Sequence, residues 1–450
     1  MYAILYPVNK PDLTSKKVAI LGFDIEGKTS YDYYREHGAE VTICDQKEQL
    51  ETPEGAPTQL GAGYLDNLDR FDIVVRTAGL IQEKVLAVNP ASITAKMTTQ
   101  INEFLRVCPT KHVIGVTGTK GKGTTSTLTT KILQAAGHDT YLGGNIGVAP
   151  FTFLDNLTPD SWVVLELSSF QLSDVQYSPH IGVCLMVAPE HLNWHHDMED
   201  YKQAKSRLFA QQSSDDMAIY FADSDNSVEI AAAGAGQKVP FFRSPGAFVN
   251  GNMITIDGQE ICTTDELKLL GRHNWQNVCA ALTAVWQAGV RDVAAIRSVL
   301  TTFAGLPHRL EKVRDLNGVT FYNDSFASTP DAAVAATSAI PGHKVMIFGG
   351  FDRQLPLENF ASDIQKQADT ITKALLIGQS AERTGQELTK AGFTNFELSS
   401  EKAMPEIVAH ARELANNGDA IILSPGFASF DMFKNFEDRG NQFKAAVEAL

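Results

Sequence analysis

A glycine-rich segment, VTGTKGKGTT at residues 116–125, constrains the fold of this chain more than any other feature. It follows a short apolar run, residues 112–115, and precedes an amphipathic run, residues 126–133, so the order strand, loop, helix is predicted. Glycines let backbone N–H groups converge on phosphate oxygens, and a helix N-terminus favours negative charge. The segment therefore predicts a nucleotide phosphate site, formed by Gly118, Thr119, Lys120, Gly121, Lys122, Gly123, Thr124 and Thr125.

Two residues of this loop decide its chemistry. Lys122 is expected to reach the outer phosphates of ATP or GTP. Gly123 stands where a serine or threonine usually follows the lysine and holds magnesium, so Thr124 or Thr125 has to take that role. The alternative interpretation is a flexible glycine and threonine turn without a ligand.

Length and composition narrow the class of protein. A chain of 450 residues is long enough for two to four domains. Its formal net charge of -15 argues against a nucleic acid or an anionic membrane as the main partner. The five cysteines lack metal-like spacing, and no apolar stretch approaches the ~18 residues of a membrane span. We expect reduced thiols, no membrane insertion and a cytoplasmic location.

The first block, residues 1–109, reads as a Rossmann-like unit. It has a strand at 17–23, a helix at 29–36 and a second strand at 40–45, which ends in Asp45. Such an acid can cap a ribose or a uracil group, but Asp24 and Glu26 occupy loop positions that disfavour a pyrophosphate. A Rossmann-like fold without an oxidoreductase cofactor is therefore the preferred interpretation.

The second block, residues 110–305, carries polar residues after predicted strands. A strand at 161–166 delivers Glu166 to the sheet edge where ligands collect, and a carboxylate there suits magnesium. Of the three histidines between 191 and 196, His191 lies nearest a strand end, and His195 and His196 are assigned to scaffolding. Lys205 is either an ordinary exposed charge or a buried functional lysine, and spacing alone favours the exposed charge.

A predicted helix in the same block carries Asn274 and Asn277. Residues at i and i+3 share a helix face, so the two amides can bind one planar ligand such as adenine. Helix capping by Asn274 is the alternative, and it accounts for only one of the two residues.

The third block, residues 306–450, has strands at 319–325, 344–350 and 420–425. Asp324, Arg353 and Ser429 follow strand ends and are expected to line one polar crevice. The fold class predicted for the chain is α/β, with three domains of mainly parallel, doubly wound sheets and a central domain like a P-loop ATPase.

Taken together, the motifs resemble the ATP-dependent Mur ligase family. The resemblance covers nearly the whole chain, and the C-terminal run at 424–440 is closest to members that add D-glutamate. The motifs that carry it are TGTKGK at 117–122, GNIG at 144–147, ELSSFQL at 166–172, Tyr201 with Lys205, Asn274 with Asn277, and PHR at 307–309.

The resemblance implies an activity, substrates and cofactors. ATP would phosphorylate the terminal carboxylate of UDP-N-acetylmuramoyl-L-alanine, and the amine of D-glutamate would attack the acyl phosphate, in peptidoglycan precursor synthesis. Two magnesium ions and a carbamate on Lys205 are implied, because a carbamate turns a lysine into an anion that can bind metal. The implied enzyme is a monomer whose partners are small molecules.

The resemblance also implies a role for individual residues. Thr124, Glu166, His191 and Lys205 would serve magnesium, and Asn145 and Ser168 the acceptor. Asn274 and Asn277 would contact adenine, Arg309 the phosphates and Asp324 the ribose. D-Glutamate would be held by Ser328, Arg353, Ser429 and Phe436. The UDP end would meet Asp45, Thr77 and Gly79.

Several positions depart from the family pattern. Phe326 and Arg353 stand where lysines are usual, and Glu190 and Asn193 replace aspartates beside His191. Ala78 replaces a proline. Two alternatives therefore stay open: a sister Mur-type or folylpolyglutamate-type ligase, and a catalytically silent homologue that binds ATP.

Overall fold

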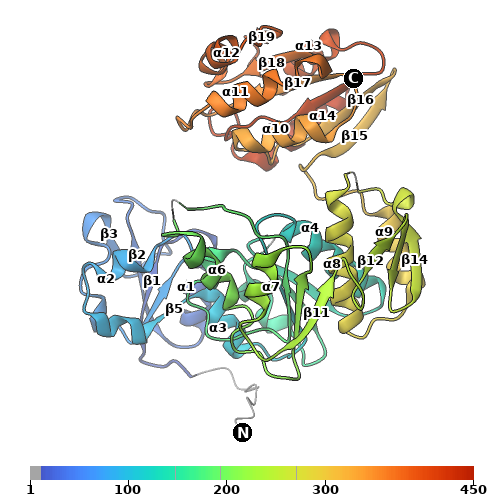
Figure 1. Cartoon of the computed structure of the whole chain (residues 1–450). Coiled ribbons are helices and arrows are strands. Elements are labelled where there is room, and N and C mark those ends of the chain that lie inside the picture. Colours follow the sequence, from blue (N-terminus) through green and yellow to red (C-terminus); the bar gives the residue numbers. More distant parts are fainter. Residues whose placement is uncertain (1–11, 147, 193, 270) are drawn as a thin grey trace. The chain divides into compact units, whose positions relative to one another are not determined.

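The computed structural model describes residues 12–146, 148–192, 194–269 and 271–450. They form two compact units, each described by itself below. The first comprises Met1–Leu267 with Arg272–Phe303, and the second comprises Lys268–Gly271 with Ala304–Leu450. Strands and helices alternate along both units (Figure 1).

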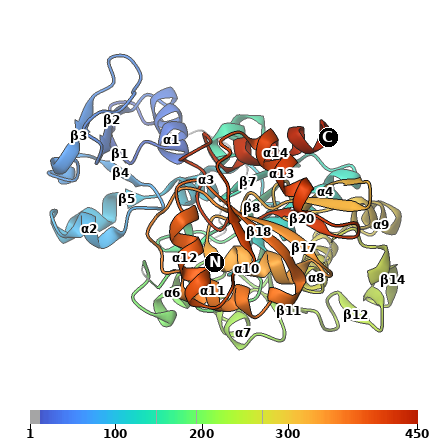
Figure 2. The same cartoon turned by 90° about the horizontal axis from the view of Figure 1, so that it is seen from above.

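The first unit opens with a parallel five-stranded sheet in the order β3-β2-β1-β4-β5. The strand order reverses at β1, so the loops after β1 and β4 flank a topological switch point. Helix α1 follows β1 directly and packs beside it (Figure 2). The elements are β1 Lys17–Leu21, α1 Ile25–Glu36, β2 Glu40–Asp45, β3 Thr58–Leu60, β4 Ile73–Arg76, α2 Gln82–Leu86, β5 Met97–Thr98 and α3 Gln100–Val107.

A second parallel sheet of the same unit has the order β11-β10-β9-β6-β8-β7. Because all its strands are parallel, their carboxyl ends share one edge. Its strands are β6 Val113–Thr117, β7 Thr140–Gly144, β8 Trp162–Glu166, β9 Ile181–Cys184, β10 Met217–Phe221 and β11 Gln237–Phe241. Its helices are α4 Lys122–Ala135, α5 Ser169–Leu172, α6 Met198–Ser206, α7 Asp225–Ala231, α8 His273–Gln287 and α9 Val293–Thr302.

A small antiparallel sheet, which the sequence analysis did not anticipate, completes the first unit. It consists of β12 (Phe248–Asn250), β13 (Met253–Ile256) and β14 (Gln259–Thr263). Strand β14 packs against α9, as the yellow part of Figure 1 shows.

The second unit is a six-stranded sheet in the order β15-β16-β20-β17-β18-β19, in which only the edge strand β15 is antiparallel. One apolar cluster joins α13 and α14 to the sheet, and another joins α10, α11 and α12, so the sheet is doubly wound (Figure 2). The elements are β15 Glu311–Leu316, β16 Val319–Asn323, α10 Pro330–Ala339, β17 Lys344–Gly349, α11 Glu358–Gln365, β18 Ile371–Ile377, α12 Ala381–Lys390, β19 Phe396–Leu398, α13 Met404–Leu414, β20 Ala420–Leu423 and α14 Phe436–Glu448.

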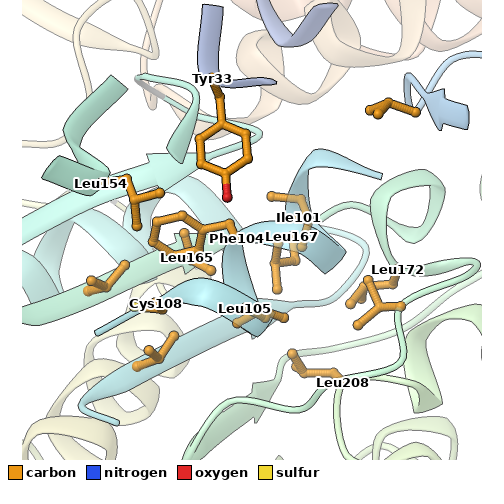
Figure 3. Packing of buried hydrophobic residues seen from close by; sticks show 14 of the residues in the cluster. Tyr33, Ile101, Phe104, Leu105, Cys108, Leu154, Leu165, Leu167, Leu172 and Leu208 are labelled. Carbon is orange, nitrogen blue, oxygen red and sulfur yellow. The ribbon is translucent and has the colours of Figure 1, made fainter. Parts of the chain in front are cut away.

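One apolar core joins the two larger sheets of the first unit. Phe104 and Leu105 of α3 pack among Tyr33, Leu154 and Leu165 (Figure 3). Replacing a fully buried phenylalanine such as Phe104 with alanine typically costs about 3–5 kcal/mol. The shared core explains why the N-terminal and central sheets belong to one compact unit.

The predicted α/β class with mainly parallel sheets is confirmed. Two helices begin earlier than predicted: α1 begins at Ile25 because Asp24 is the extended residue before it, and α4 begins at Lys122. The three domain limits drawn from the sequence remain a prediction. Each helix of the described residues is too short or too polar to span a bilayer.

Candidate active site

The glycine-rich loop lies between β6 and α4, as the sequence predicted. Gly121 precedes the helix with a φ of 89°, in the left-handed region that favours glycine. A Cβ atom there would lie 2.2 Å from Oδ1 of Asn277 on α8. The loop therefore packs directly against α8 and has no room for a side chain at this position.

Side chains of the loop are held by backbone carbonyls and by α6. Lys122 Nζ donates to the carbonyl oxygens of Gly118 at 3.0 Å and Thr119 at 2.9 Å. The Thr119 hydroxyl donates to the Ala188 carbonyl at 3.0 Å and lies 3.1 Å from the Tyr201 hydroxyl. The segment after β9 and helix α6 thus both contact the loop.

Lys205 is buried, so its assignment as an exposed charge is wrong. Its side chain is on α6, is 1% exposed, and donates to the Gly118 carbonyl at 3.0 Å. Burial, followed by the positive charge of Lys122, lowers the pKa of Lys205 to about 7. The sequence held a signal for this, because Lys205 follows Tyr201 by four residues and therefore shares its helix face, and apolar Ala204 follows Tyr201 by three.

Glu166 reaches the same sheet edge from β8. It is buried, and its Oε1 accepts a hydrogen bond from Asn145 Nδ2 at 2.9 Å. Ser168 begins α5 as its N-cap, and Gln171 completes a capping box with it. The structure therefore brings Asn145, Glu166 and Ser168 together next to the phosphate loop, since β8 pairs with β6.

His191 and His195, two of the three histidines after β9, differ in their surroundings. His191 is half-exposed at 45%, and partial burial lowers its pKa. His195 is buried between Ser169 Oγ, at 2.9 Å, and Asp200 Oδ2, at 3.1 Å, which agrees with a scaffolding role. Asn193 lies outside the described residues.

The adenine candidates on α8 are buried and hydrogen-bonded to each other. Asn277 Nδ2 donates to Asn274 Oδ1 at 2.8 Å. The N-cap of α8 is Arg272, so capping by Asn274 is wrong. The pair instead lies in the first two turns and contacts the phosphate loop through Gly121.

Donors for a metal are dispersed. Within the described residues no group of three or more histidine, cysteine, aspartate or glutamate side chains is placed to hold a metal. At the start of α4, Thr124 is half-buried, and the hydroxyls of Thr125, Ser126 and Thr127 are buried without a hydrogen-bond partner in the described structure. Hydroxyls in that state can serve as polar contacts for a bound group.

The N-terminal switch point is occupied by the loops after β1 and β4. Asp45 is buried, and its Oδ2 accepts a hydrogen bond from the Phe23 backbone N–H at 2.9 Å. The Thr77 hydroxyl donates to the Leu21 carbonyl at 2.7 Å, and Gly79 is exposed. Asp45 and Thr77 therefore shape these loops through their own hydrogen bonds.

Two contacts that the sequence analysis missed join the N-terminal sheet to the central one. The fully buried Arg76 forms a two-pronged ion pair with Asp174, with distances of 3.1 Å and 2.8 Å. Gln171 Nε2 donates to Glu26 Oε1 at 2.7 Å. A buried arginine at the end of a strand gives no sequence signal for a partner 98 residues away.

In the second unit, Asp324 follows β16 and is buried. Its Oδ2 accepts from the Ser424 hydroxyl at 2.7 Å, and its Oδ1 accepts from the Leu310 backbone N–H at 3.0 Å. Burial raises the pKa of Asp324 to about 7, against the lowering effect of these bonds and of Arg309.

Aromatic rings lie beside this carboxyl. The Arg309 guanidinium lies 3.8 Å above the ring of Phe326, and that ring meets Phe436 edge-on at 5.1 Å between centroids. A cation–π contact thus pairs Arg309 with Phe326.

The other glutamate-site candidates of the second unit differ in exposure. Ser429 is buried, Ser328 is half-buried and Arg353 is exposed. The segments after β17 and β20 meet through the bridge between Phe351 and Ala428. Arg439, which was not singled out from the sequence, is fully buried and donates to Ser325 and to the Phe427 carbonyl.

Known protein families match two regions of this chain, one around the phosphate loop and one in the second unit. Residues 116–285 match the model of the Mur ligase middle domain, and residues 308–427 match that of the Mur ligase glutamate ligase domain. The chain is 36% identical to the UDP-N-acetylmuramoylalanine–D-glutamate ligase of Clostridium kluyveri and 37% identical to that of Acetivibrio thermocellus, covering 98% of both chains in each case.

Solved structures support the fold. One is UDP-N-acetylmuramoylalanyl-D-glutamyl-2,6-diaminopimelate–D-alanyl-D-alanyl ligase from Acinetobacter baumannii, with a TM-score of 0.59, 16% identity and coverage of 96% of this chain and 93% of that one. Another is UDP-N-acetylmuramate-alanine ligase from Thermotoga maritima, with a TM-score of 0.57, 17% identity and coverage of 96% and 99%.

Proposed function

The chain belongs to the Mur ligase family, and on that premise we propose that it is an ATP-dependent ligase joining D-glutamate to UDP-N-acetylmuramoyl-L-alanine. The reaction forms an acyl phosphate and then an amide, and it releases ADP and phosphate for peptidoglycan precursor synthesis. The resemblance seen in the sequence is confirmed at the level of the family.

One observation carries the chemistry of this proposal. The phosphate loop, the buried carboxylate of Glu166 and the buried amine of Lys205 meet at one edge of the central sheet. Phosphoryl transfer to a carboxylate brings several anions together, so catalysis depends on positioning and charge neutralisation. This edge supplies cations, backbone N–H groups and one carboxylate in a largely buried place.

Each residue of the edge has a task in the proposal. Lys122 leaves the loop carbonyls and contacts the β- and γ-phosphates, while Gly118 to Thr125 surround them. Asn274 and Asn277 contact adenine beside Gly121, where α8 already touches the loop. Asn145 and Ser168 orient the acceptor carboxylate next to Glu166.

The metal-binding side chains near the phosphate loop fit magnesium that is bound mainly through the phosphates of ATP. Mg²⁺ usually keeps several waters and takes one or two carboxylates besides substrate phosphates, which matches one buried glutamate and no preassembled cluster among the described residues. We assign Glu166, Thr124, His191 and Lys205 as the contributing residues, for two ions. When bound, magnesium neutralises the charge on the transferred phosphoryl group.

Lys205 is suited to carbamylation. Carbamate formation requires a neutral amine, and a lysine with a pKa of about 7 is substantially neutral at physiological pH, unlike an exposed lysine. We therefore propose a carbamate on Lys205 as a metal ligand. Lys205→Ala should lose phosphate release and regain it when a small carboxylic acid is supplied.

The remaining assignments follow the family. Residues 1–109 bind the UDP end through Asp45, Thr77 and Gly79, residues 110–305 bind ATP, and residues 306–450 bind the amino acid. In the last block, Arg309 and Asp324 contact the nucleotide, and Ser328, Arg353, Ser429 and Phe436 contact D-glutamate. We also propose a cytoplasmic monomer that acts on small molecules.

Phosphate release with ATP, magnesium, acceptor and D-glutamate tests the function, with each component omitted in turn and the product weighed. Turnover that needs all components, with a product heavier by one glutamate residue, is expected. Lys122→Ala should abolish release. Binding of ATP without any turnover would instead favour the silent homologue.

A further inference from the structure

The switch point of the N-terminal sheet contains a carboxylate of the chain itself. Ligands of parallel sheets bind outside the strand ends where strand order reverses, which here means between the loops after β1 and β4. Glu26 lies in the first turn of α1, after β1. Its Oε2 accepts a hydrogen bond from the Ala78 backbone N–H, after β4, at 3.2 Å.

The second oxygen of the same carboxylate is also bound. Glu26 Oε1 accepts a hydrogen bond from Gln171 Nε2 at 2.7 Å. Gln171 is buried, and its own Oε1 accepts from the Ser168 backbone N–H at 3.2 Å. Glu26 is therefore held in place from two sides, by the loop after β4 and by α5.

The loop after β4 is arranged to offer that N–H. The buried guanidinium of Arg76 donates to the carbonyls of Thr77, at 3.3 Å, and Ala78, at 3.5 Å, and also to the Leu80 carbonyl. The carbonyls of this loop are thus satisfied by the arginine, while the Ala78 N–H is donated to Glu26. An oriented backbone donor at a switch point is a contact that suits an anion.

We propose that Glu26 is an internal competitor for the anionic end of the acceptor and sets the affinity for it. A nucleoside diphosphate that enters this switch point displaces the carboxylate from the Ala78 N–H and then remains beside its negative charge. This inference rests on the proposed function, since it takes the acceptor to carry such a group. Glu26 is accordingly a specificity-determining residue.

Glu26→Gln tests the proposal, because it removes the charge and keeps the shape. KM values for acceptor and ATP are measured by phosphate release, and binding of uridine 5′-diphosphate is measured by calorimetry. The acceptor KM and the Kd of the diphosphate should both fall about tenfold, with the ATP KM unchanged, as expected when one like-charge interaction between half-buried groups is removed.

Asp24→Asn is the matched control. Asp24 lies in the same loop, is 93% exposed and pairs with Lys47 at 3.6 Å. Its substitution therefore removes the same charge without changing the contact to Ala78. It should change both constants less than twofold. Glu26→Thr, a smaller neutral variant, serves if Glu26→Gln lowers the thermal unfolding temperature.

An unchanged or raised acceptor KM and diphosphate Kd in a folded Glu26→Gln protein would overturn the inference, as would an equal gain in Asp24→Asn. Failure of the proposed function looks different. In that case the wild-type protein does not turn over the acceptor at all, and the diphosphate titration still decides whether Glu26 competes.

Discussion

Replacing Lys205 with methionine should change how the stability of the first unit depends on pH. Methionine is apolar and of similar length, so the variant mainly removes the buried amine. In the folded protein the pKa of Lys205 is about 7, whereas the ordinary value is 10.5. Between pH 7 and pH 10.5 the amine of Lys205 is protonated in the unfolded chain and neutral in the folded chain. The free energy of unfolding of the wild type therefore rises with pH in this range, and this contribution is lost as pH falls.

The size of the effect follows from the two pKa values. Each unit of difference is worth 1.36 kcal/mol, and integration from pH 7 to pH 9 gives about 2 kcal/mol. Lys205→Met lacks this group. From pH 7 to pH 9 the free energy of unfolding of the wild type should therefore increase by about 2 kcal/mol relative to that of the variant.

Urea unfolding followed by tryptophan emission measures this difference. All four tryptophans, at 162, 194, 275 and 286, belong to the first unit, so the signal reports on that unit alone. The buffers must be depleted of carbon dioxide, because a carbamate would change the charge. Lys131→Met, at an exposed position on α4, is the control and should follow the wild type. Parallel profiles for wild type and Lys205→Met would refute the lowered pKa and remove the basis for a preformed neutral amine.

Two further predictions follow from the first unit. Gly121→Ala should raise the Kd for ATP, measured by calorimetry, at least about tenfold, because the new Cβ would lie 2.2 Å from Asn277 Oδ1 and the loop would have to shift. The control is Gly137→Ala, at a position with a similar φ of 86° and open space around it, and this variant should bind ATP as the wild type does. Arg76→Met should lower the free energy of unfolding, measured by urea unfolding, by about 3–5 kcal/mol, because Asp174 loses its buried partner. A loss below about 1 kcal/mol would contradict the importance of that ion pair.

The phosphate loop could be predicted from the sequence because its signals are local. A strand, a run of glycines and a helix follow one another within residues 112–135, and their order alone defines the loop. Contacts of that loop with α8 could not be predicted, because Asn277 is brought to Gly121 only by the packing of two helices distant in sequence.

Lys205 and the antiparallel sheet each have a signal in the sequence. The apolar Tyr201, four residues before Lys205 on α6, shares its helix face and predicts that it lies inside, although lysine is usually exposed. Between β13 and β14 the chain turns at Asp257-Gly258, with φ values of 51° and 75°, and a DG pair between two short strands is typical of such a hairpin.

Two cross-contacts of the first unit connect the N-terminal sheet to the part of the chain that carries the phosphate loop. Arg76 with Asp174, and Glu26 with Gln171, link the loops of the N-terminal sheet to α5 and the segment that follows it, above an apolar core shared by both sheets. A partly buried ion pair and a shared core resist displacement, because separating the two sheets exposes charge and apolar surface together. If the two sheets stay together, displacing the half-buried Glu26 carboxylate from the Ala78 N–H requires a movement of that side chain alone, so adjustment of the proposed acceptor site is expected at this residue.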